Sequence, residues 1–455
     1  MSAQSRQFPD RPSLRHLKVE AKRRLAAGEF DTLHDTQLAI AREHGFPSWT
    51  ALKEHVEGHA LAQVRWMLSR FATADSPEWT VPDAGELRRH FADDYLDLLP
   101  PDRLPGLFGA LAPQLRAGLT EVRAEPLRLR AKIAGLRVEA ATEAEPPHRL
   151  RTLRLYPLET KAADPRVAAP PRRTSGAVPE EAAVVAAESF AELGLVGLTV
   201  AGATADGSAW AISRGWANLD RAEVLLPEHR FPAFAVTKLV TATAVLRLVA
   251  DGRVRLDEPV DSHGAVTVRE LLAHTGGVDG KRGTFAYGHS GYEVLGRLIA
   301  DVTALPYPQA VTRMVLDPLG MAGSSFPTSP PTTGAATGHR LTEAGSFEPV
   351  PAEVSTLTAA AGLWTTALDL VRFGLGWSSL LPAPLVHEAL SPQAERDEFG
   401  GRAGLGWMLV PARDVAGHPG AGAGFSASVI VRGQPWVVVT NRQVLVEAVN
   451  ERLAF

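Results

Sequence analysis

Cysteine is absent from the 455-residue chain, which excludes disulfide bonds, thiolate metal sites and cysteine nucleophiles. The first ten residues lack the apolar core of a signal peptide, and no apolar stretch approaches the roughly 18 residues needed to cross a bilayer. The net charge is −4 with both signs interspersed, so no basic surface for nucleic acid or an anionic membrane is expected. These absences predict a cytoplasmic protein that binds neither nucleic acid nor membrane.

The composition is otherwise that of an ordinary globular protein, with 45% hydrophobic and 22% charged residues. At roughly 150 residues per domain, the length predicts two to four domains. The sequence contains no metal-ligand cluster, phosphate loop or dinucleotide fingerprint, so we expect neither a metal nor another cofactor. It makes no prediction of the oligomeric state.

Residues 1–75 are predicted to form a short helical leader. Apolar residues recur at helical spacing over 14–25, and a second helical stretch covers 33–43. Ser48 is a suitable N-cap for a third helix over 49–58. Stacked helical repeats need about three units for stability and only one is present, so we interpret the leader as a capping or docking element.

Residues 76–157 show the pattern of a small α+β domain. Two segments with an apolar helical face, 83–98 and 101–115, precede alternating strand-like runs between Thr120 and Pro157. Helices followed by a curved antiparallel sheet resemble the cystatin/steroid-isomerase type of domain. Its charged residues are scattered as on a solvated surface, so we interpret the domain as structural.

A linker is predicted over residues 158–178, which are rich in proline, alanine and charge and lack periodicity. The segment 179–455 opens with a predicted helix up to Gly194 and two strands joined by a Gly/Asp turn. We expect this segment to form a separate domain.

The run Phe231-Pro-Ala-Phe-Ala-Val-Thr-Lys238 precedes an apolar helix, a glycine and Leu-Asp-Glu-Pro-Val260. This order resembles the penicillin-binding-protein-like serine hydrolases, a family that includes class C β-lactamases, D-Ala-D-Ala carboxypeptidases and related esterases. Their sequence runs Ser-x-x-Lys, a helix, Gly, and Leu-Asp-x-Pro-Val. In this chain the lysine is Lys238, and the position of the nucleophilic serine holds Ala235.

The spacing of Ser-x-x-Lys has a direct physical reason. Residues three apart on a helix share a face, so the lysine amine lies beside the serine hydroxyl. Burial at the start of a helix lowers the pKa of such a lysine, which lets it act as a base. Ala235 has no nucleophilic atom. Thr237 lies about 100° round the helix from Lys238 and is not expected to replace the serine.

Two further motifs follow in the family's order. Leu-Leu-Ala-His274-Thr-Gly-Gly resembles Leu-Leu-x-His-Thr-Ser-Gly, and we interpret His274 as a core histidine beneath the site. Phe285-Ala-Tyr-Gly-His-Ser-Gly-Tyr resembles Phe-x-Tyr-Ser-Asn-x-Gly-Tyr. The resemblance implies Tyr287 as the site tyrosine and places His289 where the family has an asparagine that holds a substrate amide.

A glycine-rich segment resembles Gly-His-x-Gly-x-x-x-Gly-Phe, a strand at the sheet edge that faces the nucleophile where other members have Lys-Thr-Gly. Here it reads Gly-His418-Pro-Gly420-Ala421-Gly-Ala-Gly-Phe. The resemblance implies that the N–H groups of Ala421 and residue 235 form an oxyanion hole. His289, His418, Gly420 and Ala421 are therefore the expected substrate-binding residues.

These matches identify residues 179–455 as a member of the family, which implies an α+β fold with an antiparallel sheet flanked by helices. An isomerase-like domain before such a domain is also similar to the esterase-like proteins of clavulanate biosynthesis and related actinobacterial proteins. The implied reaction passes through an acyl-enzyme formed from a small-molecule ester, amide or β-lactam-like ligand. Lys238 would be the base, and Tyr287 would relay a proton to the leaving group.

Two interpretations of Ala235 follow. In the first, the natural enzyme carries serine at this position and the chain is a disabled hydrolase, which agrees with the otherwise intact site. In the second, the chain is a natural pseudoenzyme that acts as a ligand-binding or regulatory module, which agrees with departures at both Ala235 and His289. Under either one we expect poor turnover, because loss of the nucleophile in serine hydrolases costs on the order of 10⁶ in rate.

Overall fold

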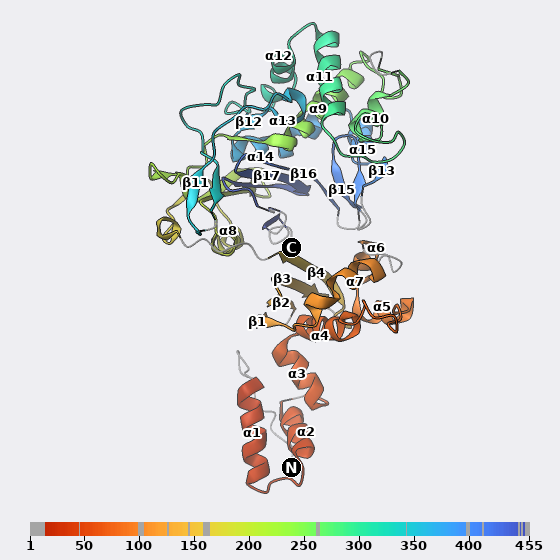
Figure 1. The fold of residues 1–455 in the computed structure, drawn as a ribbon, viewed down its shortest axis with the longest axis vertical. Helices are drawn as coiled ribbons and strands as arrows, with labels where there is room; N and C mark the ends of the chain where they lie inside the picture. The colour runs from red at the N-terminus through yellow and green to blue at the C-terminus, as the bar shows by residue number, and fades with distance from the viewer. Residues whose placement is uncertain are drawn as a thin grey trace. The chain divides into compact units, whose positions relative to one another are not determined.

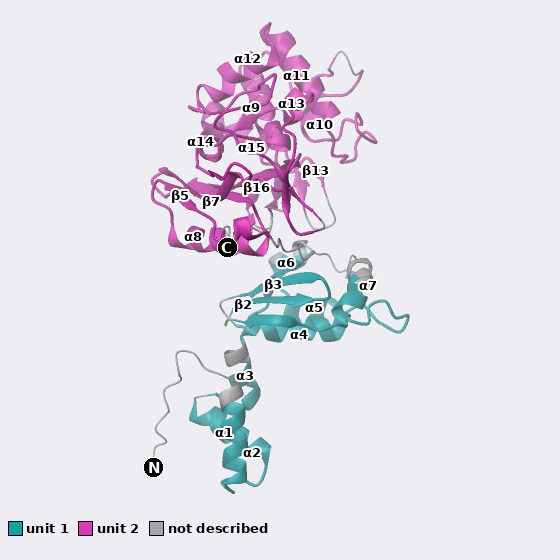
Figure 2. Ribbon diagram, turned by 60° about the vertical axis from the view of Figure 1, so that its left-hand side comes forward, with its two compact units in different colours: residues 1–158 teal, residues 159–455 magenta. Residues whose placement is uncertain are grey.

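The chain forms two compact units, residues 1–158 and 159–455, shown in different colours in Figure 2. The computed structural model describes residues 14–44, 46–98, 104–124, 127–143, 146–157, 164–260, 264–342, 344–396, 401–411, 414–444, 446 and 449–450. No helix within these ranges is long and apolar enough to cross a membrane.

The first unit begins with the three helices predicted for the leader, α1 (Leu14–Ala26), α2 (Leu33–Glu43) and α3 (Trp49–Glu57). The hydroxyl of Ser48 accepts a hydrogen bond from the N–H of Ala51 at 3.1 Å, as expected of an N-cap. The helices enclose a small core of their own, formed by Leu17, Ala21, Ile40, Ala41 and Leu52.

A fourth helix, α4 (His59–Phe71), follows Gly58, whose φ of 88° separates it from α3. Residues 59–71 lie within the predicted leader, but no separate helix is predicted for them. Its buried side chains Val64, Met67 and Phe71 share one core with the sheet of the α+β domain. The helix therefore packs with that domain, whose core buries its apolar face.

The α+β domain contains α5 (Ala84–His90), α6 (Asp93–Leu98) and α7 (Leu104–Leu115). Its antiparallel sheet has the order β1 (Thr120–Ala124), β2 (Arg128–Ile133), β3 (Leu136–Thr142) and β4 (Leu150–Pro157). The single helix predicted over 83–98 is wrong, because Phe91 leaves the helical conformation and bridges Leu150.

The sequence from Leu127 to Ala140 is predicted to form one strand-like run, but it forms a hairpin instead, because Gly135 turns the chain with a φ of 83°. The pairing of β3 with β4 shifts register between Ala141 and Thr142. This bulge places Leu150 in the same core as Leu153, although strict alternation predicts opposite faces for them.

The second unit is built on a ten-stranded sheet. Its order is β13-β14-β15-β16-β17-β18-β6-β7-β5, and β8 pairs with β7. The strands are β5 (Arg172–Ser175), β6 (Gly197–Ala203), β7 (Ala209–Asn218), β8 (Glu223–Val224), β13 (Ala394–Glu395), β14 (Arg402–Ala403), β15 (Met408–Val410), β16 (Val415–Gly422), β17 (Phe425–Arg432) and β18 (Gln434–Thr440).

Helices cover both faces of this sheet (Figure 1). Helix α8 (Glu180–Glu192) lies on one face, and α9 (Thr237–Ala250) and α14 (Ala367–Gly376) belong to the core on the other. The strands β18 and β6 are apolar on both sides for this reason: Val438 faces the α8 core, and Val437 and Val439 face the larger one.

Further helices and two small sheets complete the second unit. The helices are α10 (Val268–Leu272), α11 (Ser290–Thr303), α12 (Tyr307–Val311), α13 (Thr358–Ala361) and α15 (Ala383–Ala389). Two small sheets pair β9 (Phe231–Pro232) with β12 (Trp364–Thr365), and β10 (His339–Leu341) with β11 (Phe347–Pro349).

Part of the predicted linker is an ordered element of the second unit. Strand β5 is the outermost strand of the large sheet and pairs with β7. Upstream of it, Arg166 forms ion pairs with Asp164 and with Asp220, at 2.6 and 2.8 Å. Composition suggests a linker here because a short edge strand is exposed and carries no apolar periodicity.

Candidate active site

The segment that carries Ala235 is a single turn, η3 (Phe234–Val236), which runs directly into α9. Phe234 has a φ of 46°, a strained value for a bulky residue. The N–H of Ala233 donates to the carbonyl of Leu363 at 2.8 Å, which holds the approach to the turn in place. Ala235 is buried, with 8% of its surface exposed, three residues before the fully buried Lys238.

The amine of Lys238 makes three polar contacts. Nζ donates to the hydroxyl of Tyr287 at 3.1 Å and to the carbonyl of Ala360 at 3.4 Å, and it lies 2.8 Å from Nδ1 of His289. Burial lowers the pKa of Lys238 to about 7, against the opposing charges of Asp279 and Glu293. A substantial fraction of the amine is therefore neutral near pH 7, as required of a base.

Tyr287 lies in the loop before α11, with 41% of its surface exposed. Desolvation nevertheless raises the pKa of its phenol well above the usual value. The neutral hydroxyl can accept a hydrogen bond from Lys238 and donate one of its own. This position and protonation state suit a group that relays a proton.

His289 occupies the N-cap position of α11, but its side chain does not cap the helix. Burial and the charge of Lys238 lower the pKa of the imidazole. The carboxylate of Asp279 instead accepts from the N–H groups of Ser290 and Gly291, both at 3.4 Å. Sequence reasoning missed Asp279, because the carboxylate reaches the helix only through the folding of the intervening loop.

Glu293 is a second acid that sequence reasoning missed. Its Oε1 accepts hydrogen bonds from the N–H groups of Ala359 and Ala360, each at 2.9 Å. This contact holds α13, whose Ala360 carbonyl faces Lys238. Glu293 lies two residues after Gly291 in the family motif. Nothing in that local sequence predicts a hydrogen bond to a residue about 66 positions downstream.

His274 lies beneath the site, where its ring packs 4.8 Å from that of Tyr287 and 5.1 Å from that of Tyr292. Burial and the charge of Lys238 lower its pKa to about 3. The hydroxyl of Tyr292 donates to the carbonyl of Leu272 at 3.0 Å. These contacts agree with the interpretation of His274 as a packed, neutral core histidine.

Strand β16 lies against η3. It pairs with β17 along its length but with β15 only up to Gly417, so within the described residues no strand pairs with 418–422 on the β15 side. A Cβ on Gly420 would lie 2.3 Å from the carbonyl oxygen of Ala233 and 3.0 Å from the nitrogen of Ala235. Only glycine permits this approach, which brings the backbone of β16 to Ala235.

The position of β16 in the sheet corrects one expectation. The segment is predicted to lie at the edge of the sheet, yet β13, β14 and β15 extend the sheet beyond it. The short strand β15 ends its pairing before His418, so an open edge remains beside the site. Strand length and pairing, which the glycine-rich motif does not encode, decide this arrangement.

His418 is buried on β16, with its ring 5.9 Å from that of Tyr287. Its Nδ1 lies 2.6 Å from the carbonyl oxygen of Pro419, so Nδ1 carries the proton and donates. Burial lowers its pKa to about 3, and Nε2 is a buried acceptor with no partner among the described residues. His418 is thus a neutral ring with a free acceptor beside the tyrosine.

Thr237 is part of the scaffold. Its hydroxyl is buried and accepts a hydrogen bond from the N–H of Leu363 at 3.1 Å. This contact connects α9 to the loop before β12, in agreement with the expectation that Thr237 does not replace the serine.

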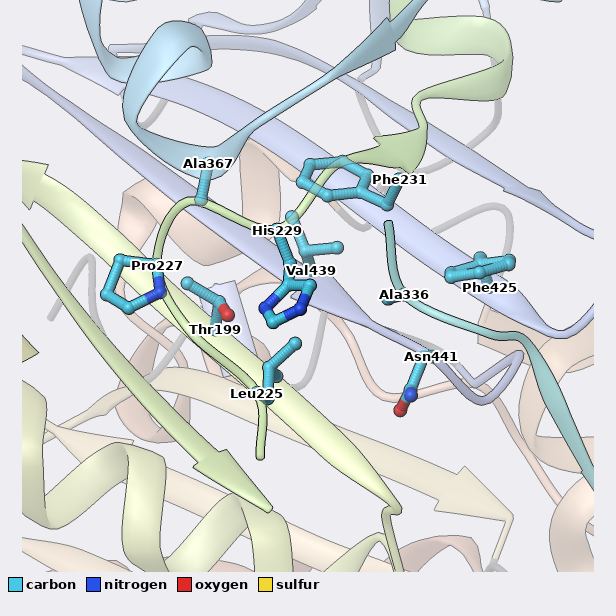
Figure 3. A pocket seen from close by; sticks show the side chains of 10 residues that line it. All are labelled: Thr199, Leu225, Pro227, His229, Phe231, Ala336, Ala367, Phe425, Val439 and Asn441. Atoms are coloured by element: carbon cyan, nitrogen blue, oxygen red, sulfur yellow. The ribbon is translucent and has the colours of Figure 1, made fainter. Parts of the chain in front are cut away.

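A small pocket lies apart from these residues, around His229, Phe231 and Asn441 (Figure 3). His229 is engaged at both ring nitrogens: Nδ1 accepts from the N–H of Leu226 at 2.8 Å, and Nε2 lies 3.1 Å from Glu223. The lining is otherwise mostly apolar, so we interpret the pocket as a packing gap without chemistry.

The structure thus brings Lys238, Tyr287 and His289 into direct contact, with His418 beside the tyrosine. It also places Gly420 against Ala235, and Ala421 follows in the same strand. In the described part of the chain, no group of three or more His, Asp or Glu residues could hold a metal ion.

Several known proteins resemble this chain. The putative penicillin-binding protein PbpX of Bacillus subtilis is 25% identical over 195 residues, which cover 35% of this chain and half the length of PbpX. The crystal structure of SurE superposes with a TM-score of 0.53 at 27% identity, over 60% of this chain and 74% of SurE. A penicillin-binding protein from Bacillus halodurans shares the fold, with a TM-score of 0.54 at 19% identity, over 61% of this chain and 99% of that protein. The beta-lactamase family model matches residues 177–453, and the chain belongs to that family.

Proposed function

We propose that residues 179–455 form an acyl-hydrolase domain whose nucleophile position is occupied by Ala235. This chain would bind a small-molecule ester, amide or β-lactam-like ligand without turning it over. Lys238 follows Ala235 by three residues. The observation that carries the proposal is the contact of its amine with Tyr287 and His289.

With serine at position 235, the reaction would proceed through an acyl-enzyme. Neutral Lys238 would take the hydroxyl proton as the oxygen attacks the carbonyl carbon. The backbone N–H groups of residue 235 and Ala421 would stabilise the oxyanion, and Tyr287 would pass the proton to the leaving group. Water would then hydrolyse the ester at residue 235. The lowered pKa of Lys238 and the neutral phenol support these roles.

The ligand class follows from the same geometry. The approach of β16 to Ala235 leaves a backbone edge that suits a carbonyl compound. SurE has also been crystallised with D-Leu, and that structure superposes on this chain at 26% identity. Esters and amides of D-amino acids are therefore included among the test ligands.

The proposal is tested with Ala235→Ser, assayed with a fluorophosphonate probe, a chromogenic cephalosporin, short-chain p-nitrophenyl esters and D-leucine amide. Labelling at residue 235 is expected, and it should be lost in Ala235→Ser/Lys238→Met. A stably folded Ala235→Ser chain that neither labels nor turns over any of these substrates would overturn the disabled-hydrolase interpretation.

The pseudoenzyme interpretation is the second candidate, and the contact of His289 with Lys238 favours it. This interpretation predicts that the unmodified chain binds one of the same ligands tightly, measured by calorimetry, while Ala235→Ser stays unlabelled. Efficient ester hydrolysis by the unmodified chain with a covalent adduct would contradict both interpretations.

We also infer that the first unit contains a domain of the cystatin/steroid-isomerase type. The support is its antiparallel β1-β2-β3-β4 sheet with α4 packed on one face. The charged residues of this unit form surface ion pairs such as Arg116 with Asp75, at 2.8 Å. A structural role for the domain accords with this arrangement.

A further inference from the structure

We propose that the amine of Lys238 is itself a nucleophile in this chain and forms a reversible imine with a small aldehyde. The inference rests on the proposed function, because it uses the same N–H groups of residue 235 and Ala421 to bind a carbonyl oxygen. It differs in the bond formed, a C=N bond at Lys238, and in the ligand class, an aldehyde. Its basis is the set of groups around Nζ.

The partners of Nζ bear on its protonation state. Within the described part of the chain, three polar atoms contact it: the phenol oxygen of Tyr287, an imidazole nitrogen of His289 and the carbonyl oxygen of Ala360. All three are neutral groups, so none forms an ion pair that would keep the amine protonated. Burial without such a pair favours the neutral amine, which is the nucleophilic form.

The nearby acids are engaged elsewhere. Asp279 accepts from the first N–H groups of α11, and Glu293 accepts from those of Ala359 and Ala360. Their charges raise the pKa of Lys238, but burial outweighs them and the pKa falls to about 7. The remaining groups that face the site, His274 and His418, are neutral because burial lowers their pKa values to about 3.

An aldehyde also needs access to Nζ. At position 235 a methyl group stands where a serine would place a hydroxyl on the same helix face as Nζ, so no side-chain oxygen there competes for a carbonyl carbon. Tyr287, which contacts Nζ directly, has 41% of its surface exposed and marks the solvent side of the amine. Lys238 itself is fully buried, so the proposed ligand is a small, unbranched aldehyde.

The chemistry balances without a further reactant. The nitrogen lone pair of Lys238 attacks the aldehyde carbon, and the oxygen takes up the displaced electrons beside the N–H groups of residue 235 and Ala421. Proton transfer from nitrogen to oxygen gives a carbinolamine. Tyr287 then protonates the hydroxyl, water leaves, and the C=N bond forms; the imine nitrogen returns a proton to the phenolate. The products are one imine and one water.

The test is reductive trapping of the full-length chain at pH 7 with propionaldehyde and sodium cyanoborohydride, read by peptide mass spectrometry. Lys281, which is exposed and described in the structure, is the internal reference. We expect propylation at Lys238 to exceed that at Lys281 at pH 7 despite burial, and to fall by about fivefold between pH 7 and pH 6, as protonation of a group with this pKa requires.

The opposite pattern would overturn the inference: propylation of Lys281 with Lys238 unmodified at both pH 7 and pH 8. Ala235→Ser supplies a second readout, because its hydroxyl would occupy the approach to Nζ and should reduce trapping at Lys238. Acylation of Ala235→Ser with no trapping in the parent chain would reject the imine alone. Trapping in the parent with no acylation of Ala235→Ser would reject the hydrolase proposal alone.

Discussion

Nδ1 of His289 lies 2.8 Å from Nζ of Lys238, so two groups that can each carry a positive charge share one contact. The charge of Lys238 lowers the pKa of the imidazole, as does burial. When the amine donates to Nδ1, the imidazole is neutral and its proton resides on Nε2. An asparagine at this position would offer an amide, which does not titrate. Because the imidazole does titrate, the protonation state of His289 directly affects that of Lys238.

Replacement of Lys238 by methionine should stabilise the protein at neutral and lower pH. The buried amine has a pKa of about 7, against 10.5 as the ordinary value, so the unfolded chain binds more protons between these two pH values. The stability of the parent chain therefore rises with pH across this window. At about 1.4 kcal/mol per pKa unit, burying the charged amine below pH 7 costs the parent chain on the order of 5 kcal/mol of unfolding free energy. Lys238→Met removes this cost, less the contribution of the hydrogen bonds that the amine made.

The measurement is thermal unfolding of parent and Lys238→Met from pH 6 to pH 10. The advantage of the variant should be largest at pH 6 and shrink toward pH 10. Lys281→Met, at an exposed position, is the matched control and should show no such trend. A stability difference between Lys238→Met and the parent that does not change with pH would contradict the neutral-amine description of Lys238.

His289→Asn should change amide recognition when combined with Ala235→Ser. A carboxamide side chain both donates and accepts, so it can pair with a ligand amide, whereas the imidazole uses Nδ1 on Lys238. One added hydrogen bond of about 1 kcal/mol predicts a roughly fivefold lower KM for D-leucine amide. The KM for a short-chain ester should change less. Equal changes for amide and ester would indicate a general effect on the base instead.

Glu293→Ala should destabilise the packing of α13 next to Lys238. The substitution leaves the N–H groups of Ala359 and Ala360 without their acceptor, at a cost of about 1–3 kcal/mol for each buried unsatisfied group. Glu293→Gln is the matched control, because its amide oxygen still accepts. Chemical denaturation should therefore rank the chains parent, Gln variant, Ala variant. Similar losses in both variants would show that charge, and not acceptance of these bonds, matters at this position.

Gly420→Ala should disrupt the approach of β16 to the turn that carries Ala235. The new Cβ would meet the carbonyl oxygen of Ala233 at 2.3 Å, and overpacking of this kind costs about 1–3 kcal/mol. Gly291→Ala is the control in the same unit, because its Cβ would meet its nearest neighbour at an ordinary 3.4 Å. Only Gly420→Ala should lower the melting temperature and abolish labelling in the Ala235→Ser background. Normal labelling of a Gly420→Ala chain in the Ala235→Ser background would contradict the role of β16 at residue 235.

Local patterns in the sequence were sufficient for much of the secondary structure. The apolar spacing of α1, α2 and α9 and the cap at Ser48 depend on neighbours within a few residues, so they can be read without the fold. The same holds for Lys238, which follows position 235 by three residues. Elements whose stability comes from distant partners were missed or misplaced: α4, which needs the sheet, and β5, which needs β7.

From the amino-acid order one can read that residue 235 carries a methyl group, that Lys238 follows on the same helix face, and that a tyrosine and a histidine come later in a family motif. The folded chain was needed to show that both of these later side chains reach Nζ, and that Asp279 and Glu293 are held by α11 and α13. The reason is physical: a pKa and a nucleophile depend on burial and on atoms within a few ångströms, and the fold assembles those atoms from segments about 50 to 120 residues apart.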